Sequence, residues 1–255
     1  GGRYVYIKDN ASGDFWCNSW QPVMKDLRKY KYQCRHGLGY SVITSQYSDI
    51  KTETTYLVPI GENCEIWMME ITNEGKKPRE LSLFSFVEFC LWNALNDMTD
   101  FQRTYNIGEA EYHDGIILHT SEAREWRHHF AYFYCSEKVH SFDTKRDAFL
   151  GPYGSLDKPA AVVNGKCSNS KACGWTVVGS HHIPLKLKPG QKKIVIFVLG
   201  INYDWDKDKY KKLVKKFSTK EAVAAELKKL AEHWDHLLDK YTGETPDEEV
   251  NLFVN

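Results

Sequence analysis

The chain has 255 residues, of which 34 are basic and 34 acidic, so its formal net charge is zero. This balance excludes nucleic-acid-binding proteins, which need a basic surface, and proteins that bind anionic membranes through polybasic segments. Aromatic residues make up 14% of the chain, and with this length they indicate an ordered protein with a sizeable core.

Residues 1–203 have the pattern of a β domain. Short apolar or alternating runs are separated by turn signals such as Asp114-Gly115 and Pro189-Gly190. Because strands and helices do not alternate in this region, we predict a large, many-stranded antiparallel β-sandwich, larger than an immunoglobulin domain. The predicted strands span residues 3–8, 39–44, 52–58, 65–72, 80–89, 115–119, 130–136, 183–187 and 193–201.

The segment 90–103 follows an apolar strand and mixes aromatic, amide and charged residues. Trp92 offers a ring on which a sugar can stack, and Gln102 and Arg103 offer planar hydrogen-bonding groups for hydroxyls. An apolar ring with a few placed polar groups is typical of a small-molecule site. The alternative is a long loop whose amides satisfy its own backbone.

The segment 143–154 contains Gly151, Pro152 and Gly154, and we expect a shaped loop that displays Phe149 and Tyr153. Loops of this length on a rigid sheet often carry binding residues, so both aromatic residues are candidate sugar contacts. The alternative is a surface loop stabilised by the neighbouring charges of Arg146 and Asp147.

The seven cysteines are odd in number and include no CxxC pair, which predicts reduced, buried thiols and a cytoplasmic location. A disulfide between Cys167 and Cys173 is the alternative. Adjacent histidines, as in His181-His182, point to opposite faces of a strand, so such a pair does not form a metal site. No run reaches the 18 apolar residues of a membrane-spanning helix.

Residues 204–255 have the pattern of helices. Ser218 and Glu221 form a capping-box pattern, and an apolar stripe that includes Trp234 follows them. Thr245 is the expected cap of a last helix whose apolar face has only begun at Asn255. With the missing initiator methionine, this predicts a piece of a longer protein.

Standard catalytic motifs, including GxSxG, HExxH, GxGxxG and a phosphate-binding Walker loop, are absent from the sequence. Carboxylate pairs for glycoside chemistry cannot be assigned from spacing alone. Several longer stretches nevertheless resemble the N-terminal region of cellobiose phosphorylase, an inverting glycoside phosphorylase related to the cellodextrin and chitobiose phosphorylases. These stretches are Gly1-Gly2-Arg3-Tyr4, Asp14-Phe15-Trp16, Trp20-Gln21-Pro22-Val23, Cys34-Arg35-His36-Gly37-Leu38-Gly39-Tyr40, Ser85-Phe86-Val87-Glu88-Phe89-Cys90-Leu91-Trp92-Asn93-Ala94 and Val162-Val163-Asn164-Gly165.

The resemblance implies an N-terminal β-sandwich over 1–203 that lacks its first strands, and linker helices over 204–255. In the family, these precede an (α/α)6 catalytic barrel. The family reaction is the reversible phosphorolysis of cellobiose to α-D-glucose 1-phosphate and glucose, with inversion. The general acid and the phosphate ligands lie on the barrel, so we assign no catalytic residue here. Phosphate is a co-substrate, and no metal or organic cofactor is implied.

The resemblance also implies a homodimer, and it places the segment 101–103 near the acceptor glucose. Arg103 and then Gln102 are therefore the first candidates for binding sugar hydroxyls. Three alternatives remain open at this point: a stand-alone carbohydrate-binding sandwich, a purely structural dimerisation domain, and cellodextrin instead of cellobiose as the substrate.

Overall fold

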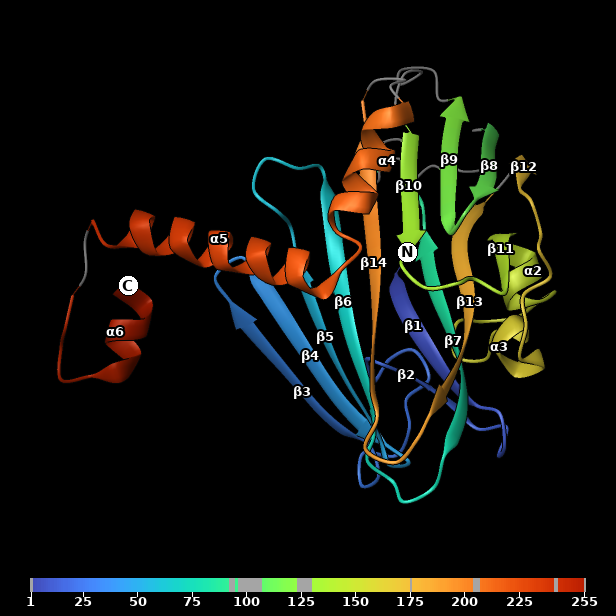
Figure 1. The fold of residues 1–255 in the computed structure, drawn as a ribbon, viewed down its shortest axis with the longest axis horizontal. Coiled ribbons are helices and arrows are strands. Elements are labelled where there is room, and N and C mark those ends of the chain that lie inside the picture. The colour runs from blue at the N-terminus through green and yellow to red at the C-terminus, as the bar shows by residue number, and fades with distance from the viewer. Residues whose placement is uncertain are drawn as a thin grey trace.

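The computed structural model describes residues 2–91, 95, 107–122, 130–174, 176–203, 207–240 and 243–254. Within these ranges the chain forms two large antiparallel sheets with helices on their outer faces (Figure 1). The predicted fold class, a many-stranded antiparallel sandwich followed by helices, is confirmed.

The smaller sheet has five strands, and its central strand β7 (Arg79–Glu88) pairs with β1 on one side and β13 on the other. On β7, Leu81, Leu83 and Val87 face the main core together with the buried Ser85, and Phe84 and Phe86 are buried on the outer face. In spatial order the strands are β11 (Ser141–Lys145), β13 (Val177–Leu187), β7, β1 (Arg3–Asp9) and β2 (Phe15–Cys17).

The larger sheet has nine strands. Its hairpin between β8 and β9 turns at Asp114-Gly115, where both residues have positive φ, as a two-residue hairpin turn requires. In spatial order the strands are β12 (Cys173–Gly174), β8 (Ile107–His113), β9 (Ile116–Glu122), β10 (Phe130–Cys135), β14 (Lys192–Asn202), β6 (Cys64–Asn73), β5 (Ile50–Leu57), β4 (Tyr40–Tyr47) and β3 (Lys31–Gly37).

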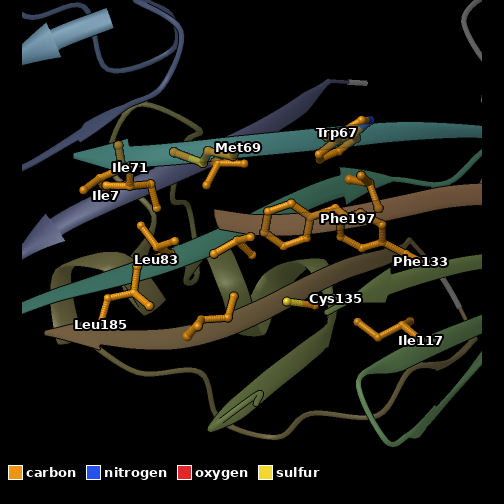
Figure 2. Close-up of a cluster of buried hydrophobic side chains, with 14 of the residues drawn as sticks. Ile7, Trp67, Met69, Ile71, Leu83, Ile117, Phe133, Cys135, Leu185 and Phe197 are labelled. Carbon is orange, nitrogen blue, oxygen red and sulfur yellow. The ribbon is translucent and has the colours of Figure 1, made fainter. Parts of the chain in front are cut away.

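The main core lies between the sheets, where apolar side chains from both inner faces meet (Figure 2). Ile7 and Leu83 come from the five-stranded sheet. From the nine-stranded sheet, the ring of Trp67 packs 5.2 Å from that of Phe133 and 5.9 Å from that of Phe197. All five side chains are inaccessible to solvent. Strand alternation therefore places one row of side chains from each of β1, β6, β7, β10 and β14 in this core.

Helices cover parts of both outer faces. On the nine-stranded sheet, Val214 and Phe217 at the end of α4 (Lys207–Lys216) join Val198 of β14 in a second apolar cluster. On the five-stranded sheet, α2 (Arg146–Leu150) and α3 (Ala160–Asn164) cover a third cluster that includes Phe84 and Phe86. Each sheet is therefore buried on both faces where a helix covers it.

The structure corrects two helix caps. Helix α5 (Lys220–Leu238) begins after Thr219, whose hydroxyl accepts the N–H of Ala222, whereas Ser218 donates to the carbonyl of Lys215. Helix α6 (Glu248–Val254) begins after Asp247, whose carboxylate accepts the N–H of Glu249. Ser218 and Thr245 are therefore wrong as predicted caps, since the residue nearest each helix start accepts the N–H group.

The apolar stripe of α5 is only half buried. Val223 and Leu230 lie in the core, whereas Leu237 is 45% exposed. Figure 1 shows the C-terminal half of α5 extending past the nine-stranded sheet, which explains this exposure. Val250 and Phe253 on α6 are exposed as well, as the sequence predicted for an unpartnered apolar face. Among the described helices, none is both long and apolar enough to cross a membrane.

The cysteines follow the predicted pattern in part. Cys17, Cys64, Cys135 and Cys167 are buried thiols, and Cys167 forms no disulfide with Cys173. Cys34, Cys90 and Cys173 are exposed, which corrects the expectation of buried thiols at these three positions. Burial raises the pKa of the Cys17 thiol well above the ordinary value, and burial together with the nearby Asp143 carboxylate does the same for Cys167, so these groups are poor nucleophiles.

Candidate functional site

Glu88, just before the segment 90–103, and Arg146, within the segment 143–154, meet at one end of the five-stranded sheet. Strand β7 ends at Glu88, directly before the segment 90–103, and α2 begins at Arg146. The Nε of Arg146 donates to Oε1 of Glu88 at 2.7 Å, and the side chain of Glu88 is only 7% exposed. The ion pair therefore holds the bases of both segments together, although they are far apart in the sequence.

Trp92, Gln102 and Arg103 lie outside the described residues, so their assignment as sugar contacts stays a prediction. The described part of the site is a hollow of about 250 Å³ next to the Arg146–Glu88 pair. Lys145, Arg146 and Asp147 line one side. Cys173 and Thr176 also line the hollow.

The segment 143–154 is only partly the loop that the sequence predicted. Residues Arg146–Leu150 form α2, and the ring of Phe149 is completely buried against Tyr6 and Phe86, at centroid distances of 5.9 and 4.8 Å. The expectation that Phe149 is displayed on the loop is therefore wrong, because the outer face of the sheet supplies an apolar cluster for its ring.

Tyr153 is fully exposed, as expected, and its backbone adopts φ of 59°. A non-glycine residue in the left-handed region is uncommon and carries a modest conformational cost. Gly151, with φ of 90°, precedes it in the same turn. The backbone therefore presents the Tyr153 ring to solvent, where a partner domain or a sugar can contact it.

Sequence reasoning missed the role of Asp143. Its buried carboxylate accepts hydrogen bonds from the backbone N–H and the hydroxyl of both Ser168 and Ser170. These bonds fix the stretch that leads into β12 and thus the wall of the hollow. The sequence contained one signal, since Ser168-Asn169-Ser170 is a cluster of turn-forming residues, but its partner lies 25 residues away.

Replacing Arg146 by alanine is expected to lower the free energy of unfolding by about 1–2 kcal/mol, because the Glu88 carboxylate remains buried without this partner. Urea denaturation measures the change. Lys145→Ala, at an exposed neighbour, is the matched control and should change stability by less than about 0.5 kcal/mol. A double-mutant cycle with Glu88→Gln isolates the pair, and a coupling energy near zero would contradict the proposed linkage.

The hollow is small, and charged and polar side chains are among its lining. Its volume is below the usual range of enclosed small-molecule sites, and its lining offers guanidinium, ammonium and hydroxyl donors to sugar oxygens. In the described part of the chain, no three histidine, cysteine or acidic side chains converge in a way that would hold a metal ion.

Comparison with known proteins links this scaffold to sugar enzymes. The family described as glycosyl hydrolase 94, supersandwich domain, matches residues 1–220. The chain is 33% identical to the N,N'-diacetylchitobiose phosphorylase of Vibrio furnissii over 259 residues, covering 100% of this chain and 31% of that protein. It is 37% identical to the solabiose phosphorylase of Paenibacillus borealis over 194 residues, covering 75% of this chain and 25% of that protein.

Solved structures support the fold over most of the chain. A bacterial glucoamylase complexed with acarbose aligns with a TM-score of 0.52 at 10% identity, covering 93% of this chain and 30% of that one. At this identity the likeness concerns the fold alone. The chain spans about a third of the length of the Vibrio furnissii relative.

Proposed function

Because the chain belongs to the glycosyl hydrolase 94 family, as its supersandwich domain, we propose that it is the N-terminal part of a disaccharide phosphorylase. The match over residues 1–220 carries this proposal, and relatives named as disaccharide phosphorylases support it. In the proposed reaction, cellobiose and phosphate give α-D-glucose 1-phosphate and glucose with inversion.

The proposed chemistry needs one acid and one nucleophile. A phosphate oxygen forms the new bond to the anomeric carbon as the glycosidic C–O bond breaks, and a carboxylic acid protonates the leaving oxygen. Phosphate is already anionic, so the second carboxylate that activates water in an inverting hydrolase is unnecessary. We place the acid and the phosphate ligands on an (α/α)6 barrel after residue 255, without a metal or organic cofactor.

The proposed role of this chain is to shape the acceptor-sugar site and a dimer interface. Arg103 and Gln102 would donate hydrogen bonds to hydroxyls of the acceptor, and Trp92 and Tyr153 would provide ring surfaces. The Arg146–Glu88 pair supports this role, because it anchors both segments at one end of the sheet. Residues 1–203 would form the sandwich and 204–255 the linker of a cytoplasmic homodimer.

The choice of disaccharide is tested by a substrate panel. The protein encoded by the complete reading frame is incubated with phosphate and, separately, cellobiose, cellotriose, N,N'-diacetylchitobiose or solabiose, and the sugar 1-phosphate released is measured. We expect release from cellobiose. Release from another disaccharide alone would correct the substrate, and no release from any of them would contradict a phosphorylase of these sugars.

The location of the catalytic groups is tested with the 255-residue chain alone. This chain should release no glucose 1-phosphate, because the proposed acid and phosphate ligands lie outside it. Turnover by the purified 255-residue chain would contradict this placement.

A further inference from the structure

A second hollow, of about 430 Å³, opens on the outer face of the five-stranded sheet, and none of the predicted sugar contacts lines it. Its floor is a single row across three neighbouring strands, where Lys8 of β1 pairs with Ser82 of β7, and Ser82 pairs with Pro184 of β13. Figure 1 shows these strands side by side, with α3 next to them. Because side chains alternate along a strand, His182 shares the outer face with Pro184.

The loops around this row form its walls. Asn164 and Gly165, at the end of α3, lie on one side, and His140, just before β11, lies on the other. Gly165 has φ of 75°, which ends the helix, and the Lys8 side chain packs beside it, with Nζ 3.7 Å from where a Cβ would lie. The volume falls within the usual range of small-molecule sites.

His182 provides a polar atom that has no partner among the described residues. Its ring is 4% exposed and stacks on Phe84 at 4.6 Å, and its Nδ1 lies 3.0 Å from the hydroxyl oxygen of Ser141. Its Nε2 is buried without a hydrogen-bond partner. A buried, unsatisfied ring nitrogen is costly, and His182 is one of the residues that line the hollow, which makes a ligand in the hollow a candidate partner for this nitrogen.

The hydrogen bonds around Ser141 allow the tautomer of His182 that carries its proton on Nε2. The hydroxyl oxygen of Ser141 already accepts the backbone N–H of Cys167, so its own proton is available to Nδ1 of His182. Burial, together with the charge of His140, lowers the pKa of His182 to about 4, so the ring is neutral at pH 7. A neutral ring that accepts at Nδ1 carries its proton on Nε2.

Lys8 adds a positive charge to this donor. Its ammonium donates to the carbonyl of Val163, which leaves two further N–H groups. The amide oxygen of Asn10 accepts from the hydroxyl of Ser82, which leaves the amide N–H groups of Asn10 as donors. No lining residue in the described ranges carries a carboxylate.

We propose that this hollow binds a phosphate group, held by the ammonium of Lys8 and by Nε2–H of His182. Donors from β1, β13 and the surrounding loops suit an oxyanion with several oxygens better than a neutral sugar, which needs acceptors as well. Inorganic phosphate and a sugar phosphate share this chemistry. Both compounds take part in the proposed phosphorolysis. The evidence for this site, however, is the set of hydrogen-bond donors in the hollow and does not depend on that reaction.

Chemical labelling of Lys8 tests the site in the unmodified protein. Acetic anhydride acetylates free amines, and peptide mass spectrometry follows Lys8 and Lys186 separately. Lys186 is the internal control because it lies on the same face of the sheet outside the hollow. Saturating phosphate or glucose 1-phosphate should slow acetylation of Lys8 at least about threefold and leave Lys186 unchanged. Equal rates at Lys8 with and without both ligands would overturn the proposal.

Titration calorimetry with inorganic phosphate and glucose 1-phosphate, on the unmodified protein and on variants, tests the Lys8 donor. Lys8→Gln should weaken binding of the phosphate group at this site about tenfold or more, because a charge-assisted bond is lost. Lys8→Arg should retain binding, and Lys186→Gln should match the unmodified protein. If glucose 1-phosphate binds and inorganic phosphate does not, the site takes a sugar phosphate. Binding of glucose that depends on Lys8, or equal affinity for the phosphate ligands in Lys8→Gln and the unmodified protein, would overturn the proposal.

Discussion

Replacement of Arg103 by alanine in the complete protein is expected to raise the KM for glucose in the synthetic direction about tenfold to a hundredfold. The reason is that a guanidinium that donates two hydrogen bonds to sugar hydroxyls contributes on the order of 2 kcal/mol. Initial rates of phosphate release from glucose 1-phosphate and glucose measure the effect. The KM for glucose 1-phosphate should change much less, since Arg103 is proposed to contact only the acceptor.

Two variants sharpen this test. Gln102→Ala should show a smaller loss in the same direction, and Arg28→Ala, at an exposed arginine paired with Asp26, should leave the kinetics unchanged. An unchanged KM for glucose in Arg103→Ala would contradict the acceptor-site assignment. The loop interpretation, in which the amides and Arg103 satisfy only their own segment, would then be favoured.

Acidification from pH 7 to pH 5 should reduce the free energy of unfolding by roughly 4 kcal/mol through His181 and His182 together. Burial lowers the pKa of His181 to about 3 and, together with the charge of His140, that of His182 to about 4, whereas an unfolded histidine titrates near 6.5. Between these values the unfolded state binds more protons than the folded state. Stability therefore falls as the pH falls through 6.5. Below the pKa values of the two histidines in the folded state, these groups cause no further loss.

Urea denaturation of the chain at pH 7 and pH 5 measures this loss. Carboxylates also contribute to acid instability, so the informative quantity is the difference between variants. His181→Asn should remove about half of the histidine contribution, roughly 2 kcal/mol of the loss. The same change at His113, whose side chain is 65% exposed, is the matched control. A loss that is identical in His181→Asn and the unmodified chain would contradict the buried neutral state of His181.

The alternating and apolar runs of the sequence located most of the long strands. Residues 65–72 and 80–89 correspond closely to β6 and β7, which are buried by neighbours on both sides. Strand β3 was missed because all of its residues are exposed, so no apolar alternation marks it. Strand β11 was missed because the sequence around Asp143 has the composition of a loop, and its carboxylate is satisfied by residues far along the chain.

For the candidate site, the sequence predicted which segments carry suitable residue types, but not how their side chains are oriented or which contacts they make. Aromatic, amide and guanidinium groups identified the segments 90–103 and 143–154 as sugar-binding candidates. The orientation of Phe149 depends on an apolar cluster formed by β1 and β7, which no local pattern reveals. The link between Arg146 and Glu88 depends on which strands are neighbours, and those residues are separated by 58 positions.

The sequence by itself determined the fold class, the hairpin turn at Asp114-Gly115, the helical character of the C-terminal region and the family resemblance. These features depend on local periodicity and on contiguous motifs. Only the tertiary structure brought together Lys8, Ser82 and His182, because the register between β1, β7 and β13 is set by the packing of whole sheets. A shift of one residue in that register would turn each of these side chains to the opposite face, so the hollow exists only in the folded sandwich.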